Sequence, residues 1–588
     1  MLSIPCVEPL LEQIHGQILQ RWPAAARMSS LELKRRFPDR VNLTAAWLVP
    51  DIIAEAPSDL ILAVDSDFPW SLPLIALPEP INGIWYPHIE GDGYICVVPS
   101  SAVYELPVSL CHFEALVADA EMVLAHGRTQ ENDKDFYAEA HSYWSLVVPQ
   151  SGNVLLIQRP PAGHDIWWAA ICGANIITGP TCASLEEWSK KSKQKISHAE
   201  PTLILRLSAP LHPRDYPLTP RDLIQLAENM GASELLRAAV KRWRYRAPLR
   251  MLICFEHSGK TVYLGAELPA PRTVYMPGAK EPGVPGFRPA SKSATARLCA
   301  LRQIPSRFGH WRAIPIYREF LLERTSGGSA KPLARCHVVI VGCGALGGQL
   351  AVHLAQAGIG KLTLLDSDVL DWRNVGRHVL DGTFVGRNKA TALKDAILRR
   401  FPDADVDAHA KNWEDFFRTA PDVLDSADLV VSATAEVASN LHLDTLSKDL
   451  RIAPVIFAWM EPFAACAHAV FRHPNGAGLA ELTDSFGLLL EPVIDRESLP
   501  PLPQEPSCGA FYQPYSAISA LCAVSVVAEL VVDALTGRAA TSTLRTWVGS
   551  PPAFQDNKLS ITPVWHSRIN KNGFSRRYDQ PIVEGIPR

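Results

Sequence analysis

Three glycines in a short segment provide the clearest chemical signal in the sequence. Gly342, Gly344 and Gly347 follow an apolar run at residues 337–341, and Asp366 ends the next apolar run. Glycines let the backbone approach a phosphate closely at the first turn of a helix, where unpaired N–H groups favour an anion. An acid at the end of the following strand can accept hydrogen bonds from ribose hydroxyls. The spacing therefore predicts a strand–turn–helix–strand unit that binds a nucleotide.

The residues that follow Asp366 favour a triphosphate. They form a polar and cationic series that consists of Asp368, Asn374, Arg377 and Lys389. A dinucleotide-dependent oxidoreductase, which the glycines alone would also fit, does not need this series, whereas cations stabilise the charge of a reacting triphosphate. The segment resembles the ThiF, MoeB and ubiquitin-activating family, whose pattern is DxDxVxxxNxxR followed by VGxxK. The resemblance implies ATP-dependent adenylation of a protein C-terminal carboxylate, with these residues on the nucleotide.

A second stretch, residues 85–97, ends in a cysteine motif. Five of its residues coincide with the pattern HPNIxxxGxIC of ubiquitin-conjugating enzymes, which it resembles: Pro87, Ile89, Gly93, Ile95 and Cys96. The resemblance implies that Cys96 is a catalytic cysteine that carries an acyl group. His88 stands where the family has the asparagine that supports the oxyanion, and an imidazole can still donate one hydrogen bond there. Taken without its neighbours, Cys96 would be a small buried hydrophobic residue.

A second cysteine motif, Pro506-Ser507-Cys508-Gly509, precedes an apolar helical pattern at residues 518–535. The dipole of a helix stabilises a thiolate near its amino end. In the activating enzymes that the chain resembles, a cysteine on such a crossover loop receives the acyl group from the adenylate, which makes Cys508 the candidate. Cys522 lies within the helical pattern, and we expect it to pack in the core.

Two further expectations come from the same resemblance. An arginine before the glycine turn reaches the triphosphate in the family, often that of the partner subunit, so Arg318 and Arg324 are candidates and a homodimer is expected; solvated helix arginines are the alternative. The family's magnesium-binding aspartate is absent after the strand at residues 427–433. Glu436 can take that role for Mg²⁺, because this ion accepts any carboxylate that fits its octahedron; otherwise Asp368 or the phosphates themselves must hold the ion.

Composition limits the remaining function classes. The chain has 588 residues, is 47% hydrophobic and 20% charged, and carries a net charge of −4. A folded globular protein is expected, with no reason to bind nucleic acid or an anionic membrane. No apolar run is expected to cross a bilayer, and the first residues are not a signal peptide. The 12 cysteines include no CxxC, which predicts a reducing, cytoplasmic location and no structural zinc.

These motifs predict α/β and α+β domains in a definite order. Residues 1–150 form a ubiquitin-conjugating-like α+β domain, and residues 301–588 form a Rossmann-like adenylation domain of the ThiF type that contains the catalytic-cysteine loop. Residues 151–300 carry no motif. They form either an α/β linker domain or a degenerate second adenylation half.

The order of the two domains resembles the fused conjugating–activating proteins of bacterial CBASS antiphage systems. That resemblance implies thioester formation on Cys508, transfer to Cys96 and isopeptide ligation to an acceptor lysine. The cargo would be the C-terminal tail of a cGAS-like nucleotidyltransferase. The alternatives are a fused enzyme for a bacterial ubiquitin-like modifier, a sulfur-carrier adenylyltransferase, and a scaffold that has lost catalysis.

Overall fold

The computed structural model describes most of the chain. It covers residues 7–50, 59–80, 86–97, 105–147, 150–244, 248–270, 293–305, 307–323, 330–474, 476–504, 512–574 and 576–581. Cys508 and Arg324 lie outside these residues. The chain divides into two compact units. The first consists of Met1–Leu155, Pro160–Cys182 and Ser197–Ile314, and the second of Leu156–Arg159, Ala183–Ile196 and Pro315–Arg588.

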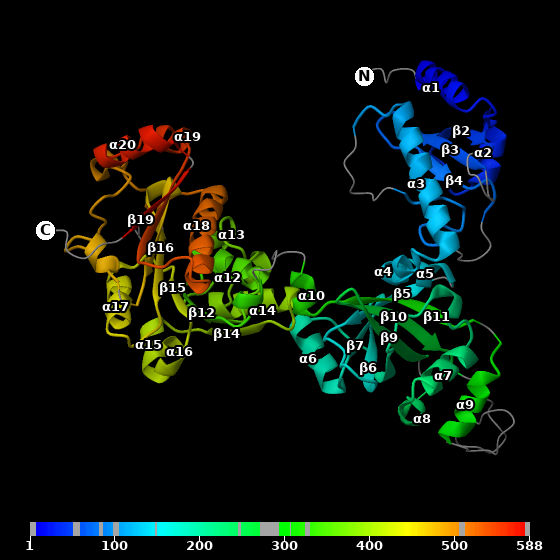
Figure 1. Cartoon of the computed structure of the whole chain (residues 1–588). Helices are drawn as coiled ribbons and strands as arrows, with labels where there is room; N and C mark the ends of the chain where they lie inside the picture. Colours follow the sequence, from blue (N-terminus) through cyan, green and yellow to red (C-terminus); the bar gives the residue numbers. More distant parts are fainter. Residues whose placement is uncertain are drawn as a thin grey trace. The chain divides into compact units, whose positions relative to one another are not determined.

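The first unit begins with a four-stranded antiparallel sheet and the helices that cover it (Figure 1). Its elements are α1 (Val7–Arg21), β1 (Ala26–Arg27), α2 (Ser30–Arg36), β2 (Leu43–Val49), β3 (Leu60–Asp65), β4 (Leu74–Ala76) and α3 (Leu110–Thr129). Alternate strand residues face opposite sides, so Leu60 and Leu62 pack with Phe113 of α3, whereas Ile61 and Ala63 pack with Leu33 of α2. The α+β character expected for this region is confirmed.

Two short helices, α4 (Asp133–Ala138) and α5 (Ala140–Val147), follow α3. Their buried side chains belong to the core of the next domain, not to the core under α3. Phe136 and Trp144 pack in that second core, and Trp144 Nε1 donates to the backbone oxygen of Gly265 at 2.9 Å. Segments adjacent to the first sheet in sequence are therefore anchored on the domain that follows it.

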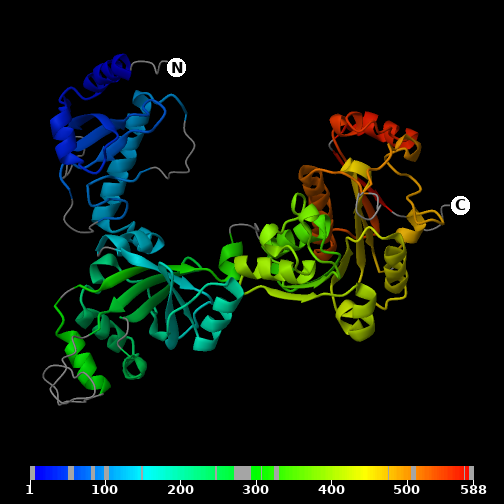
Figure 2. The same cartoon turned by 180° about the vertical axis from the view of Figure 1, so that it is seen from behind.

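That domain is a closed barrel of strands in the order β10-β11-β5-β7-β6-β8-β9 (Figures 1 and 2). The strands are β5 (Gln150–Leu156), β6 (Asp165–Cys172), β7 (Asn175–Gly179), β8 (Glu200–Arg206), β9 (Leu249–His257), β10 (Lys260–Leu268) and β11 (Gly309–Pro315). The accompanying helices are α6 (Cys182–Ser192), α7 (Pro220–Asn229), α8 (Ser233–Arg242) and α9 (Ala294–Arg302). β8 and β9 are parallel, whereas β9–β10, β10–β11 and β6–β7 are antiparallel. An adenylation half would need an open, mainly parallel sheet. The alternative of a degenerate second adenylation half is therefore wrong.

The second unit is built on an eight-stranded sheet in the order β14-β13-β12-β15-β16-β17-β18-β19. The strands are β12 (His337–Val341), β13 (Lys361–Leu365), β14 (Asp405–His409), β15 (Leu429–Ser432), β16 (Val455–Met460), β17 (Cys466–Arg472), β18 (Thr543–Val548) and β19 (Arg576–Pro581). The strands from β14 to β16 are parallel, and those beyond β16 pair antiparallel. Parallel strands joined by helices give the Rossmann-like fold expected from the glycine motif.

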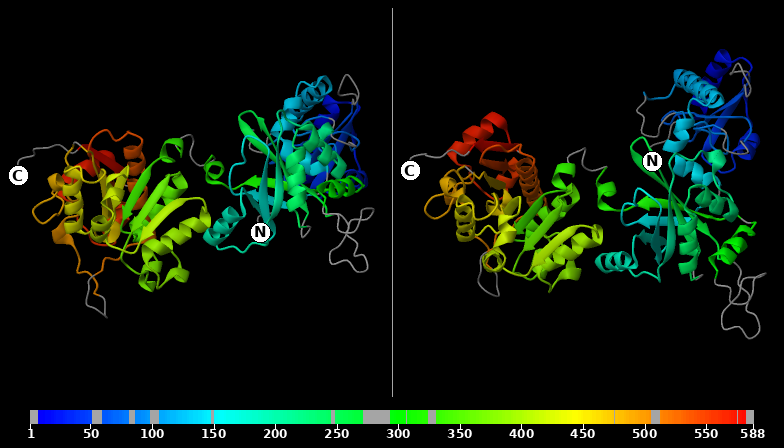
Figure 3. Two further views of the ribbon diagram at one scale, coloured as in Figure 1. Left: turned by 90° about the horizontal axis from the view of Figure 1, so that it is seen from below. Right: turned by 60° about the horizontal axis from the view of Figure 1, so that its bottom comes forward.

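Helices cover both faces of this sheet (Figure 3). The helices of this unit are α10 (Arg318–Leu322), α11 (Ala330–Leu333), α12 (Ala345–Ala357), α13 (Trp372–Val375), α14 (Lys389–Arg400), α15 (Trp413–Thr419), α16 (Pro421–Asp425), α17 (Val437–Lys448), α18 (Ala517–Leu535), α19 (Pro551–Gln555) and α20 (Pro563–Asn572). Val338 and Ile340 of β12 pack with α12, α14 and α18, whereas Val339 and Val341 pack with α15 and α17. Burial on both faces explains the continuous apolar sequence of β12.

Helix α18 corrects one sequence expectation. Within the described residues it is the one helix long and apolar enough to cross a membrane, with a mean hydropathy of 2.1. The expectation that no apolar run reaches that length is wrong for this segment. Val524, Val527 and Val531 pack against α12 and β17 in the core, and core helices of soluble proteins pass the same test of length and composition.

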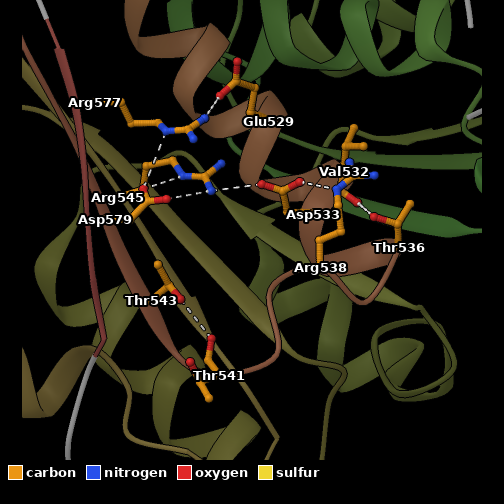
Figure 4. A network of polar contacts seen from close by, with 10 residues as sticks. All are labelled: Glu529, Val532, Asp533, Thr536, Arg538, Thr541, Thr543, Arg545, Arg577 and Asp579. Carbon is orange, nitrogen blue, oxygen red and sulfur yellow. Dashed lines mark hydrogen bonds and ion pairs between the residues drawn. The ribbon is translucent and has the colours of Figure 1, made fainter. Parts of the chain in front are cut away.

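Charged contacts attach the last strand and α18 to the sheet (Figure 4). Arg545 of β18 is buried and donates to Asp533 of α18 and to Asp579 of β19, each at 2.9 Å. Arg577 of β19 also pairs with Glu529 of α18. Because a buried guanidinium left unpaired costs several kcal/mol, this network holds α18, β18 and β19 in one arrangement.

Candidate active sites

The glycine turn between β12 and α12 has the geometry expected of a close backbone approach. Gly342 has φ +85°, and a Cβ at Gly347 would lie 1.9 Å from the carbonyl oxygen of Gly342. No other residue fits at position 347 without opening the turn. Gly344 precedes α12 as its N-cap, and no neighbouring atom of the described residues lies within 4 Å of the place of its Cβ. The turn thus leaves open space at the amino end of α12, where an anion is favoured.

Asp366 follows β13 and holds the loops around this turn together. Its carboxylate accepts the backbone N–H groups of Cys343 and Asp368, each at 2.7 Å. The side-chain amide of Asn388 donates to the backbone oxygen of Asp366 at 2.7 Å. The structure therefore brings Asp366 and the glycine turn together, as the motif requires.

Lys389 lies close to Asp368, whose backbone N–H donates to Asp366. Its side chain is 12% exposed, and its Nζ lies 2.8 Å from a carboxylate oxygen of Asp368, whose side chain is 67% exposed. Lys389 begins α14. A cation with little exposure beside the turn is suited to hold phosphate oxygens.

The remaining predicted nucleotide residues line the next loop. Asn374 caps α13, since its Oδ1 accepts the backbone N–H of Asp371 at 3.1 Å. The guanidinium of Arg377 donates to the backbone oxygen of Arg373 at 3.1 Å and lies 5.3 Å from the ring centre of Tyr515. Arg377 thus stands between the nucleotide side and the cavity described below.

Sequence reasoning missed His378. Its Nδ1 accepts the backbone N–H of Leu380 at 3.0 Å, so its Nε2 carries the proton that is donated to the backbone oxygen of Cys343 at 2.7 Å. Burial lowers the pKa of His378, which keeps it neutral. His378 thus supports the glycine turn through the backbone of Cys343. In the sequence, only its position next to Arg377 could have indicated this role.

A cavity of about 670 Å³ opens beside the glycine turn. Gly344 and Leu346 form one wall, and segments after β15 and β16 and residues around 487–499 form the others. Asp366, Asp368 and Lys389 are not among its lining residues. The glycine turn connects these residues with the cavity, because Gly344 lines the cavity and the backbone N–H of the adjacent Cys343 donates to Asp366. The turn follows β12 at its boundary with β15, where the strand order reverses, and open α/β sheets bind ligands at such a point.

Arg318 does not lie at this site. Its guanidinium donates to the backbone oxygens of Ala355, Ile359 and Gly360, at the carboxyl end of α12. α12 has 13 residues, so this end lies about 20 Å from the glycine turn. Arg318 therefore caps α12, and its assignment to the triphosphate is wrong within one chain. Arg324 lies outside the described residues.

The magnesium expectation stays a prediction. Among the described residues no group of three or more His, Cys, Asp or Glu side chains could hold a metal. Mg²⁺ bound to a nucleotide needs one or two carboxylates besides phosphates and waters, and the exposed carboxylate of Asp368 meets that need. Glu436 is exposed at the amino end of α17 and is not a lining residue of the cavity.

Cys96 lies in an exposed loop of the first unit. Its backbone N–H donates to the backbone oxygen of His88 at 2.7 Å, and Ile89 and Ile95 form a bridge beside it. Burial and the nearby carboxylates of Glu139 and Glu90 raise the pKa of the Cys96 thiol. The short hairpin thus fixes the position of an accessible thiol, and the expectation of a buried hydrophobic cysteine is not met.

His88 is held by two carboxylates that the sequence did not assign. Its Nε2 lies 3.2 Å from Asp135, and its Nδ1 lies 3.4 Å from Glu139. Both acids come from α4 and the residue after it. Hydrogen bonds to Glu139 and Asp135 outweigh burial and raise the pKa of His88 to about 8. An imidazolium is therefore expected at neutral pH, with both of its N–H groups directed at carboxylates.

The backbone of His88 is constrained as well. Its φ is +64°, a left-handed conformation that non-glycine residues rarely adopt. Its N–H donates to the hydroxyl of Tyr143 at 2.8 Å, and that hydroxyl donates to Glu139 at 3.2 Å. The role of His88 as an oxyanion donor stays a prediction; it would require one ring N–H to leave its carboxylate.

The other described cysteines differ in their burial. Cys343, Cys466, Cys254 and Cys172 are buried. Cys522 is partly exposed within α18, so the expectation that it packs in the core is not met. Cys508, the predicted acceptor of the acyl group, lies outside the described residues.

The fold and the sites define the class: a Rossmann-like domain with a nucleotide turn beside a ligand cavity, preceded by a domain with a conjugating-type cysteine hairpin. Comparison with protein families agrees. The ThiF family matches residues 317–568, and Prokaryotic E2 family B matches residues 19–151. The chain therefore carries a ThiF-family domain and a prokaryotic E2-type domain.

Similar proteins share parts of this chain. An ATP-dependent ubiquitin transferase-like protein Cap2 of Enterobacter hormaechei is 31% identical over 26% of this chain and 25% of its own length. One of Pseudomonas aeruginosa is 29% identical over 39% of this chain and 41% of its own. The aligned segments thus span less than half of either relative.

Two further likenesses are to a curated protein and to a solved structure. The mouse adenylyltransferase and sulfurtransferase MOCS3 is 41% identical over 14% of this chain and 18% of its own length. A solved structure of E. coli MccB with ATP is 20% identical, with a TM-score of 0.32, over 44% of this chain and 67% of that one.

Proposed function

We propose that this protein uses ATP to adenylate the C-terminal carboxylate of a protein and then passes the acyl group through two cysteines to an amine. The observation that carries the proposal is that the glycine turn contacts both groups of residues. The backbone N–H of Cys343 donates to Asp366, which lies near Lys389 and Asp368, and the adjacent Gly344 lines the cavity. A nucleotide phosphate and an entering carboxylate would meet at the amino end of α12, where developing negative charge is stabilised.

The chemistry balances as a series of acyl transfers. A carboxylate oxygen attacks the α-phosphorus of ATP, and pyrophosphate leaves. The Cys508 thiolate attacks the acyl carbon, and AMP leaves. The Cys96 thiolate then displaces Cys508, and an acceptor lysine displaces Cys96 while its nitrogen loses a proton. Thiolates perform such exchanges well at neutral pH.

The chain's residues have separate roles in the first step. The turn residues Gly342, Gly344 and Gly347 bring backbone N–H groups to the phosphates, and Asp366 binds the ribose. Lys389, with Arg377 and Asn374, stabilises phosphate charge. Asp368 would hold Mg²⁺, which supplies Lewis-acid stabilisation of the phosphates when bound.

The cellular role that fits this architecture is antiphage defence of the CBASS type in the cytoplasm, by a homodimer. The cargo is the tail of a cGAS-like nucleotidyltransferase and the acceptor is a protein lysine. Similarity to Cap2 proteins, together with the E2-type and ThiF-type domains, supports this proposal. A ubiquitin-like modifier is the alternative cargo.

Experiments on the full chain test the proposal. Mg²⁺-dependent ATP–pyrophosphate exchange should be lost in Lys389→Ala and kept in Lys394→Ala, a surface lysine on the same helix. A reductant-labile adduct on Cys96 should form only when Cys508 is intact, and mass spectrometry of the purified wild type should identify the cargo. Exchange that is absent from the wild type, or an adduct on Cys96 that persists in Cys508→Ala, would contradict the proposal.

A sulfur-carrier adenylyltransferase is the second candidate, favoured by the similarity to MOCS3. Such an enzyme does not need Cys96. If Cys96→Ala retained the full activity of the protein toward its carrier, this candidate would be preferred over the conjugating enzyme.

A further inference from the structure

The cavity beside the glycine turn has walls that are mainly hydrocarbon. Large apolar side chains from separate segments line it: Val437, Trp459, Leu479, Leu488, Leu489 and Ile494. Val437 and Leu488 keep 38% and 41% of their surface exposed. Apolar surface that lines a cavity and stays in contact with water favours an apolar ligand group, because covering it releases that surface from water.

Two polar side chains of the walls, Glu461 and Asn440, are already engaged within the protein. The carboxylate of Glu461 accepts the backbone N–H groups of Val493 and Ile494, each at 2.9 Å, and pairs with His468 at 2.6 Å. The amide oxygen of Asn440 accepts the hydroxyl of Ser432 at 2.6 Å. A polar side chain of a ligand that displaced water here would have to compete with these bonds.

Arg496 is the one cation among the described residues that line the cavity. Its Nη2 donates to the backbone oxygen of Leu489 at 3.0 Å, and its Nη1 lies 3.9 Å from Asp484. Arg496 therefore braces the apolar segment after Gly487 and is itself 43% exposed. These contacts fix the position of the cavity wall near Leu488 and Leu489.

We propose that the cavity selects a C-terminal tail that carries bulky apolar side chains shortly before its terminal carboxylate. The inference rests on the proposed function, because that function places a tail in this cavity. A tail of glycines would leave Val437 and Leu488 in contact with water and would gain little from a cavity of about 670 Å³. A leucine or phenylalanine near the carboxylate covers them while the carboxylate reaches Gly344.

The test uses ATP–pyrophosphate exchange by the full chain. The probes are two versions of one small carrier protein, each with an eight-residue C-terminal tail. The tails differ only in the two residues before the last one, which are Leu-Leu in one version and Gly-Gly in the other. The apolar tail should lower KM by about tenfold or more, the expected gain from burying one large apolar side chain. Equal KM values, or a lower KM for Gly-Gly, would overturn the inference and leave the proposed function standing. No exchange with either tail would overturn both.

A matched pair of variants locates the preference. Leu488→Ser should remove most of the advantage of the Leu-Leu tail. Leu490→Ser, at an exposed leucine two residues away that is not among the lining residues, should keep it. A preference that survives in Leu488→Ser, or that falls equally in both variants, would refute the assignment to this cavity.

Discussion

The two candidate sites differ in how they are built. The nucleotide site is made mainly of backbone: glycines at the end of β12, with Asp366 and Lys389 from the next two segments in sequence. The Cys96 site is made of side chains from distant segments, because Asp135, Glu139 and Tyr143 hold His88 from about fifty residues away. A site made of local backbone tolerates no change of shape, whereas a site made of side chains can be altered one interaction at a time.

The largest effect is therefore expected from Gly347→Ala. A Cβ placed 1.9 Å from the oxygen of Gly342 must open the turn, so ATP–pyrophosphate exchange should fall by about a hundredfold or more. Gly376→Ala is the control, since no atom lies within 4 Å of its Cβ position. Equal activity of the two variants would show that close backbone approach is not what the site requires.

A smaller effect is expected from Glu139→Gln. Without this carboxylate the pKa of His88 should fall from about 8 toward 6.5, and the pKa of the Cys96 thiol should also fall. NMR titration of His88 and the pH dependence of Cys96 alkylation measure these shifts. Discharge of the Cys96 thioester onto an amine should change about tenfold, while ATP–pyrophosphate exchange stays unchanged.

The sign of the pH effect on stability follows from the same interaction. A histidine whose pKa is raised on folding stabilises the fold fully below about pH 6.5, and this contribution is lost as pH rises through about 8. In Glu139→Gln this dependence should weaken. Glu131→Gln, at an exposed acid beside His126, should leave it intact; an unchanged profile in Glu139→Gln would contradict the pairing.

Tyr143→Phe should affect transfer from Cys96 only through the position of His88. It removes the hydroxyl that accepts the His88 N–H but keeps the ring against Phe136, so unfolding should become easier by about 1–2 kcal/mol. Transfer from Cys96 should slow several-fold in urea-free assays with unchanged adenylation. Tyr137→Phe, whose ring faces His257, is the control, and an equal loss of transfer in both variants would argue against the clamp on His88.

The smallest effect is expected from Cys522→Ala. This cysteine lies within α18 and is only partly exposed, so thioester formation should not change measurably. Loss of the adduct in Cys522→Ala, detected by non-reducing electrophoresis, would move the first acceptor from Cys508 to the helix.

The difference between the sites also explains what could be predicted. The strand–turn–helix order, the glycines and Asp366 lie within one βαβ unit, so their spacing along the chain determines their spacing in the fold. No sequence pattern indicated that Asp135 and Glu139 face His88, because the residue patterns of α4 and α5 are those of ordinary amphipathic helices. His378 was missed for a similar reason: its partner is a backbone oxygen. Arg318 was wrongly assigned to the triphosphate because it is an arginine close to the glycine motif in sequence. In the fold it caps the carboxyl end of α12, the end opposite the glycine turn.

The sequence alone determined the nucleotide turn, the conjugating-type hairpin and the order of the domains, because each depends on local backbone geometry and on residue types at short spacing. The tertiary structure decided that residues 150–315 close into a barrel. It also decided that Asp135 and Glu139, on and next to a helix packed in the barrel's core, lie beside His88 and favour its protonated form. The apolar cavity beside the glycine turn is likewise a result of the tertiary structure. These features depend on contacts between residues far apart in the chain, which no local pattern encodes.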